Sequence, residues 1–320
     1  MEKKKIIVRV DASFEQGSSL FAWLKKYAAH YDDRYIYQDE FAFTTEPLDE
    51  CDALLIFNNP SVKINTLCYP ENVIAFMMEP GDHYEHPWMY KGLDQYAAIY
   101  SPVQSADNVI LSHGYLGWYL QQNFAALSSL QVPEKKSVIS CISSNLSLLK
   151  GHRLRLNFIK TLQAQIPQID FFGRGNNFID DKLNALLPYR YSIAIENTSA
   201  PYYFTDKIND CFLAYTVPLY YGCKNMGRYF PAKSFIQINI EDPKKAIHQI
   251  RQVMDNDDWQ QRAAAVVEAR ELVLHKFQPL AGAVELLKQC KPSVKKTVQL
   301  KPVPGSWIRK VKNIMSPLNK

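Results

Sequence analysis

Two hydrophobic patterns alternate along the chain. Short apolar runs such as Ala53–Phe57 and Val138–Ile142 are typical of strands covered on both faces of a sheet. Longer segments such as Ser19–His30 and Arg153–Gln165 carry apolar residues at helical spacing instead. This alternation predicts an α/β protein built on parallel sheets. Further strands are expected at Ile6–Val10, Val73–Met78, Ala97–Tyr100, Val109–Leu111, Ile169–Phe172 and Phe235–Ile240, and further helices at Leu116–Leu127, Pro243–Met254, Asp258–Lys276 and Pro279–Gln289.

A polar segment, Val132–Ser137, separates the two halves of this series and predicts a linker between two Rossmann-like domains. The expected domains are residues 1–132 and 133–290. Residues 291–320 contain eight basic and no acidic side chains, so we expect them to form a separate basic tail. From Trp307 onward, apolar and basic residues interleave as in a short amphipathic helix.

The charge of the chain changes where this tail begins. The net charge is +5 at pH 7, which leaves −3 on residues 1–290. Because the body is mildly acidic and its aromatic residues fall in expected cores, we expect no nucleic-acid partner. Residues 301–320 are suited to peripheral contact with an anionic membrane surface, and a solvated or docked tail is the alternative.

Metal and cofactor sites are not indicated. The six cysteines form neither a C-x-x-C pair nor a disulfide framework, and the D-x-D motif Asp255–Asp257 lies between two expected helices, where capping accounts for it. The first residues, M-E-K-K-K-I-I-V-R-V, are too polar for a signal peptide or a membrane span. The expected location is the cytoplasm, with the tail as a peripheral attachment to the inner face of the membrane.

Residues 191–222 combine a strand, a polar loop, a helix and a second strand. Tyr191–Ile195 is an apolar run, Thr205 can cap a helix, and Val217–Tyr221 is apolar again. A unit of this length implies two parallel strands joined by a right-handed crossover, and ligands bind outside the carboxyl ends of such strands. The helix N–H groups and the charge of Lys207 lie at the same place, so the pattern predicts a phosphate or pyrophosphate site.

The same stretch, I-A-I-E-N-T-S-A-P-Y-Y-F-T-D-K followed by P-L-Y-Y-G, closely resembles the signature of the α-1,3/4-fucosyltransferases, glycosyltransferase family ten, of bacterial type. The match runs from about Pro188 to Asp242. The resemblance implies the GT-B fold, in which an N-terminal acceptor-binding domain and a C-terminal GDP-sugar-binding domain face a cleft. It also implies an inverting, metal-independent transfer of L-fucose from GDP-fucose to the 3- or 4-hydroxyl of an N-acetylglucosamine or glucose unit in a surface glycan.

Inverting transfer needs a carboxylate that deprotonates the acceptor hydroxyl and positive charge that stabilises the departing nucleotide. Glu79 ends the strand Val73–Met78 and resembles the family's general base, although a residue in this position can also simply cap a turn. The positions that match the family's donor-binding residues are Arg155, Asn197, Tyr203, Asp206 and Lys207. Of these, Lys207 and Arg155 are expected to hold the diphosphate.

Two alternatives stay open. The family usually has glutamate where this chain has Asp206, and the shorter side chain changes the reach of the carboxylate. A GT-B transferase that uses another nucleotide sugar is therefore the first alternative. The second is a glycan-binding protein without catalysis, which the presence of Glu79, Asn197 and Lys207 disfavours.

Overall fold

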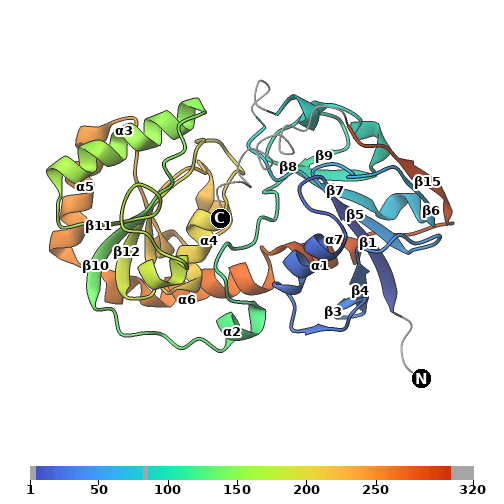
Figure 1. Cartoon of the computed structure of the whole chain (residues 1–320), viewed down its shortest axis with the longest axis horizontal. Helices are drawn as coiled ribbons and strands as arrows, with labels where there is room; N and C mark the ends of the chain where they lie inside the picture. Colours follow the sequence, from blue (N-terminus) through green and yellow to red (C-terminus); the bar gives the residue numbers. More distant parts are fainter. Residues whose placement is uncertain (1–4, 82–85, 304–320) are drawn as a thin grey trace. The chain divides into compact units, whose positions relative to one another are not determined.

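The computed structural model describes residues 5–81 and 86–303, and they divide into two compact units (Figure 1). Of the described residues, unit 1 contains 5–81, 86–115, 123–125 and 279–303. Unit 2 contains residues 116–122 and 126–278. Each unit is built around its own sheet, as the alternating pattern predicts.

Unit 1 has an eight-stranded sheet in the order β2-β3-β4-β1-β5-β7-β8-β9. The strands are parallel from β4 to β9, whereas β2 and β3 pair in antiparallel fashion at one edge. Their bounds are β1 Ile6–Ala12, β2 His30–Tyr31, β3 Ile36–Gln38, β4 Phe41–Thr44, β5 Ala53–Phe57, β7 Val73–Phe76, β8 Ala98–Ser101 and β9 Val109–Leu111. Every residue of β5 and β7 is buried, which explains why these strands read as continuous apolar runs.

Helix α7, Pro279–Leu287, completes the core of unit 1 from the far end of the sequence. A Cβ atom on its Gly282 would overlap with the ring of Tyr115, so the helix and the ring pack without space for a side chain. Tyr115 in turn stacks on Phe76 at the end of β7, with 4.5 Å between ring centroids. Helix α1, Gly17–Lys25, also belongs to this unit, and a second, antiparallel sheet joins β6, Ile64–Cys68, to β15, Lys296–Leu300.

Unit 2 has a five-stranded parallel sheet in the order β11-β10-β12-β13-β14. Its strands are β10 Ser137–Ile142, β11 Asp170–Phe172, β12 Tyr189–Ile195, β13 Val217–Tyr221 and β14 Ile236–Gln237. Its helices are α3 Lys150–Gln165, α4 Asp206–Leu213, α5 Pro243–Asn256 and α6 Trp259–His275, while α2, Phe124–Ser128, spans the boundary between the units. Helix α3 packs beside α5 and α4 beside α6 (Figure 1).

The strand order of unit 2 contains a switch point between β10 and β12. The chain leaves β10 through α3 towards β11 on one side, and it leaves β12 through α4 towards β13 on the other. Because both crossovers of a parallel sheet are right-handed, α3 and α4 cover opposite faces. The loops that follow β10 and β12 therefore diverge, which is where open α/β sheets bind ligands.

The helix predicted over Leu116–Leu127 is wrong for most of its length, since only the short α2 forms near its end. Residues 116–122 have no regular secondary structure because side chains of α4 form hydrogen bonds with their backbone N–H and carbonyl groups. Asn209 donates to two carbonyl groups at 2.8 and 2.9 Å, and a carboxylate oxygen of Asp210 accepts from the N–H of Tyr119 at 2.8 Å. These tertiary bonds replace the hydrogen bonds that a helix would have formed.

The predicted domain boundaries also need correction. Residues 132–137 lie inside unit 2 rather than between the units, and α7 belongs to unit 1. The start of the predicted tail, from 291 to 303, is part of unit 1 as well. There β15 pairs with β6, and Lys295 bonds both Glu50 and Asp52 at 2.7 Å. The amphipathic part of the predicted tail, from Trp307 onward, lies outside the described residues.

Candidate active site

The loops after β10 and β12 meet at the switch point of unit 2. The first leads into α3 and the second, residues 196–205, leads into α4. A Cβ atom on Gly151, in the first turn of α3, would overlap with the carbonyl oxygen of Asn197. Glycine thus lets the start of α3 lie directly against the second loop, so the amino ends of α3 and α4 border one site.

Glu196 is the buried centre of this site, and its side chain is 0% exposed. Its carboxylate accepts hydrogen bonds from the N–H and the hydroxyl of Thr205, both at 2.9 Å, and from the amine of Lys207 at 2.8 Å. Thr205 is also the N-cap of α4, as predicted, because its hydroxyl accepts from the N–H of Lys207. Through these hydrogen bonds Glu196 fixes the first turn of α4.

Lys207 reaches back to Glu196 and remains 30% exposed. Burial on its own would lower the pKa of the Lys207 amine, but the charges of Glu196 and Asp206 outweigh burial and raise that pKa. The group is therefore a cation at neutral pH. An ammonium has three N–H donors, and Glu196 and Thr205 take two of them. Within the described residues no acceptor is recorded for the third.

Arg155 and His152, both on α3, add to the positive character of the site. The Arg155 side chain lies close enough to Glu196 for their charges to interact, and its Nη2 donates to the hydroxyl of Ser144 at 3.1 Å. Burial, together with the charges of Arg155, Lys207 and Arg153, lowers the pKa of His152 to about 4. His152 is thus neutral at pH 7, mainly because it is partly buried, and its positive neighbours act in the same direction.

Asp206 is engaged by a residue that the sequence did not single out. The amine of Lys182, in a short 3-10 turn before β12, bonds the carboxylates of Asp206 and, at 2.8 Å, of Asp210. Burial acts to raise the pKa of Asp206, yet Lys182 and Lys207 outweigh it and lower that pKa below its ordinary value. Lys182 carries no motif signal, because it becomes part of the site only through the packing of its turn against α4.

Asn197 and Tyr203 lie on the same loop as Glu196. The hydroxyl of Tyr203 donates to the side-chain oxygen of Asn197 at 3.4 Å, and the tyrosine is only 6% exposed. All five predicted donor-binding residues therefore lie in unit 2, on α3, on the loop after β12 or on the first turn of α4. The structure brings them around the one switch point.

A small cavity lies beneath these residues. It measures about 40 Å³, and its polar lining residues include Lys182, Lys207 and Asp210. The apolar residues Ile142 and Ile195, at the ends of β10 and β12, line it as well. A cavity of this size and polarity can hold a water molecule that hydrogen-bonds the charged groups.

Glu79, the predicted base, belongs to unit 1 and lies beyond the carboxyl end of β7. Its carboxylate is 28% exposed and lies 3.4 Å from Nε2 of His86. The chain just before it is held by packing, because a Cβ atom on Gly114 would overlap with the backbone of Met77 and Met78. The N–H of Met78 also donates to the side chain of Asn58 at 2.8 Å.

The residue next to Asn58 in unit 1 was missed by sequence reasoning. Asn59 follows β5, is 1% exposed, and both polar atoms of its side chain lack a partner within the described residues. Buried amides usually have hydrogen-bond partners, so this position at a strand's carboxyl end is a candidate for contact with a hydroxyl-rich ligand. Only its place after an apolar strand could have indicated it.

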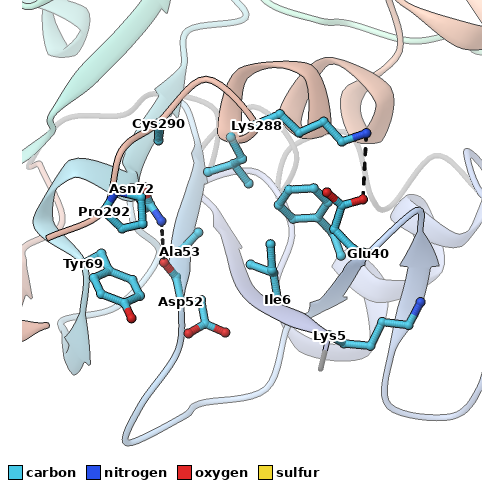
Figure 2. Close-up of a pocket in the computed structure, with 12 residues that line it drawn as sticks. Lys5, Ile6, Glu40, Asp52, Ala53, Tyr69, Asn72, Lys288, Cys290 and Pro292 are labelled. Atoms are coloured by element: carbon cyan, nitrogen blue, oxygen red, sulfur yellow. Dashed lines mark hydrogen bonds and ion pairs between the residues drawn. The ribbon is translucent and has the colours of Figure 1, made fainter. Parts of the chain in front are cut away.

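Unit 1 also has a cavity of about 440 Å³ at the amino ends of β1 and β5 (Figure 2). Its lining mixes acidic and basic side chains: Lys288 lies 3.9 Å from Glu40, and Asn72 donates to the carbonyl of Asp52 at 2.8 Å. Glu79 lies at the carboxyl ends of the strands, the opposite edge of the sheet. This cavity is therefore separate from the predicted catalytic position.

Two further properties of the described residues bear on function. No helix in residues 5–81 and 86–303 is both long and apolar enough to cross a lipid bilayer. In the same ranges, no group of three or more histidine, cysteine, aspartate or glutamate side chains is arranged to hold a metal ion. The expectation of a metal-independent reaction stays a prediction.

The geometry of unit 2 is suited to an anion. Two helix amino ends, the Lys207 ammonium and the Arg155 guanidinium surround one loop at the carboxyl edge of a parallel sheet. Backbone N–H groups at helix amino ends, together with lysine and arginine, are the groups that proteins use for phosphates. The arrangement can therefore bind a phosphorylated ligand and stabilise a departing diphosphate.

Comparison with known proteins identifies similar chains. Residues 132–265 match the family model "Glycosyltransferase family 10 (fucosyltransferase) C-term". The chain is 25% identical over 177 residues to a 4-galactosyl-N-acetylglucosaminide 3-alpha-L-fucosyltransferase of Pongo pygmaeus, covering 54% of this chain and 48% of that protein. It is 24% identical over 209 residues to a 3-galactosyl-N-acetylglucosaminide 4-alpha-L-fucosyltransferase of Homo sapiens, covering 63% and 55%. The chain thus spans about half the length of the curated relatives it matches.

A crystal structure of an alpha1,3-fucosyltransferase with GDP is similar in fold, with a TM-score of 0.52 at 14% identity over 87% of this chain and 94% of that chain. The predicted α/β fold of GT-B type is confirmed. The matched segment contains β10 to β14 and with them every predicted donor-binding residue. Residues 132–265 are thus similar to the C-terminal domain of the fucosyltransferases of glycosyltransferase family 10.

Proposed function

We propose that this protein transfers L-fucose from GDP-fucose, with inversion and without a metal ion, to a hydroxyl group of a glycan. The observation that carries the proposal is the grouping of Lys207, Arg155 and the amino end of α4 around Glu196, inside the segment that matches the family. Lys207 and Arg155 bind the diphosphate, and Asn197, Tyr203 and Asp206 orient the nucleotide and the sugar.

In this proposal Glu79 is the general base. Its carboxylate takes the proton of the acceptor hydroxyl while that oxygen forms the new bond to the anomeric carbon of fucose. The bond from this carbon to the diphosphate breaks, and GDP leaves with the electron pair, stabilised by Lys207 and Arg155. The acceptor class is the 3- or 4-hydroxyl of N-acetylglucosamine or glucose in a surface glycan.

The donor can be tested by thermal unfolding with GDP, GDP-fucose, GDP-mannose, UDP and a UDP-sugar in turn. A ligand that binds the native state raises the unfolding temperature as its concentration exceeds its dissociation constant. We expect stabilisation by GDP and GDP-fucose. Stabilisation by UDP without stabilisation by GDP would contradict the proposal and support a transferase that uses another nucleotide sugar.

The reaction can be tested by incubating the protein with GDP-fucose and an N-acetyllactosamine acceptor in a metal-chelating buffer. We expect release of GDP and an α-fucosylated product, since the donor carries β-linked fucose and inversion gives the α-anomer. Binding of a glycan without any turnover or hydrolysis of GDP-fucose would support a glycan-binding protein instead.

We also propose a cytoplasmic location with peripheral membrane contact through residues 301–320, in which basic and apolar residues interleave. The test is flotation of the full chain and of a variant truncated after Val303 with anionic liposomes. The truncation point follows from the structure, because earlier truncation would remove β15 from its pairing with β6. Equal flotation of both proteins would contradict this proposal.

A further inference from the structure

Helix α4 has an arrangement of charge that works against the binding of an anion. Asp206 is the first residue of the helix, Asp210 lies one turn further along, and the Glu196 carboxylate accepts from the N–H of the N-cap residue Thr205. A diphosphate at this end would approach three carboxylates. Like charges four residues apart on a helix already repel each other, and the incoming ligand would add to that repulsion.

Two lysine side chains offset the negative charge of these three carboxylates. Glu196 is paired with Lys207 at 2.8 Å. Asp206 and Asp210 are both paired with Lys182, whose amine lies over the ring of Tyr119 at 4.8 Å from its centroid. Asp210 is 1% exposed, so its charge has little solvent to screen it. Lys182 is thus the cation that offsets these two carboxylates.

Lys182 is held in place by the turn that carries it. Asp181 caps this turn by accepting from the N–H of Leu183 at 3.1 Å, and it also accepts from the side chain of Gln122 at 2.6 Å. The same segment, residues 116–122, is bound to α4 through Asn209 and Asp210. Because these bonds fix its turn and α4 relative to each other within unit 2, Lys182 is preorganised between the two carboxylates.

We propose that Lys182 is a positioning residue of the donor site, a built-in counter-charge that allows α4 to keep Asp206 at an anion-binding helix end. This inference rests on the proposed function only in naming GDP as the anion. Lys182 acts through Asp206 and Asp210, not by contact with the nucleotide. Its effect on GDP affinity must therefore depend on the charge of Asp210.

The charges of the three groups give the test. With all three groups ionised, Lys182, Asp206 and Asp210 sum to a charge of −1. Lys182→Met changes that sum to −2, and Lys182→Met with Asp210→Asn returns it to −1. Asparagine at 210 retains the side-chain oxygen that accepts from the N–H of Tyr119. We expect GDP to bind Lys182→Met about 10-fold more weakly, and the double variant to recover most of that loss.

The measurements are calorimetric titration with GDP and unfolding of the nucleotide-free proteins, with Lys160→Met as a control at an exposed lysine of α3. Without GDP, Lys182→Met should unfold at lower temperature and the double variant should regain stability, because the uncompensated carboxylate is gone. If the double variant binds GDP as weakly as Lys182→Met, or Lys182→Met binds like the wild type, the inference is overturned. If the wild type does not bind GDP at all, the proposed function fails. The unfolding temperatures of the wild type, Lys182→Met and the double variant then decide whether Lys182 offsets the charges of Asp206 and Asp210.

Discussion

The two candidate positions are held by different forces. In unit 2 the donor-site residues are fixed mainly by ion pairs: Glu196 with Lys207, and Asp206 with Lys182. In unit 1 the chain leading to Glu79 is fixed by close packing of Gly114 against Met77 and Met78. Changes at Lys207 or Lys182 should therefore act mainly through charge, whereas changes at Gly114 or Gly282 should act mainly through volume.

The largest expected effect is at the base. Glu79→Gln keeps the size of the side chain and removes its ability to accept the proton, so we expect kcat to fall about 10²- to 10⁴-fold. GDP affinity should not change, because the donor groups all lie in unit 2. Steady-state transfer and a GDP titration separate the two quantities. Normal turnover by this variant would show that Glu79 is not the base.

A change at Lys207 should weaken the binding of GDP, which a change at Glu79 leaves unaltered. Lys207→Ala removes a charged donor to the diphosphate and also leaves the buried Glu196 without its cation. We expect GDP affinity to fall about 10- to 100-fold, with a lower unfolding temperature. Titrations at low and high salt should show that the difference between variant and wild type shrinks as screening increases. Unchanged GDP affinity would contradict a diphosphate contact.

The volume sensitivity of unit 1 can be tested at Gly282. A methyl group there would overlap with the ring of Tyr115, which stacks beside the end of β7. We therefore expect Gly282→Ala to lower the free energy of unfolding by about 1–3 kcal/mol in denaturant titrations. Gly227→Ala is the matched control, since a Cβ atom there meets no atom within 4 Å. Equal stability of the two variants would argue against packing as the organising force.

The smallest effect concerns pH. The pKa of His152 is lowered to about 4 in the folded protein, whereas an unfolded histidine titrates near 6.5. Between these values the unfolded chain binds a proton that the folded chain does not, so the free energy of unfolding falls as pH decreases from about 6.5 to 4. His152→Gln should remove that part of the decline, at most about 1 kcal/mol after solvent screening. Identical profiles for both proteins would show that burial and the positive neighbours do not lower the pKa of His152.

The sequence predicts features that depend on local signals better than features that depend on contacts between distant segments. Lys207 and Thr205 could be placed because a cap and a helix start are local signals, and Arg155 because it resembles a family position. Lys182 and Asn59 could not, because their roles arise from contacts between distant segments. The helix predicted near Tyr119 failed for the same reason, since α4 takes the backbone bonds that local periodicity assigns to a helix.

The discontinuity of unit 1 has a consequence during synthesis on the ribosome. Residues 126–278 emerge before α7 and β15, so unit 2 can complete its sheet while unit 1 still lacks both elements. The usual order, in which N-terminal domains fold first, is then reversed. Until Gly282 is synthesised, Tyr115 and the Phe76 ring on which it stacks have no helix to pack against, so translation of α7 closes the core of unit 1.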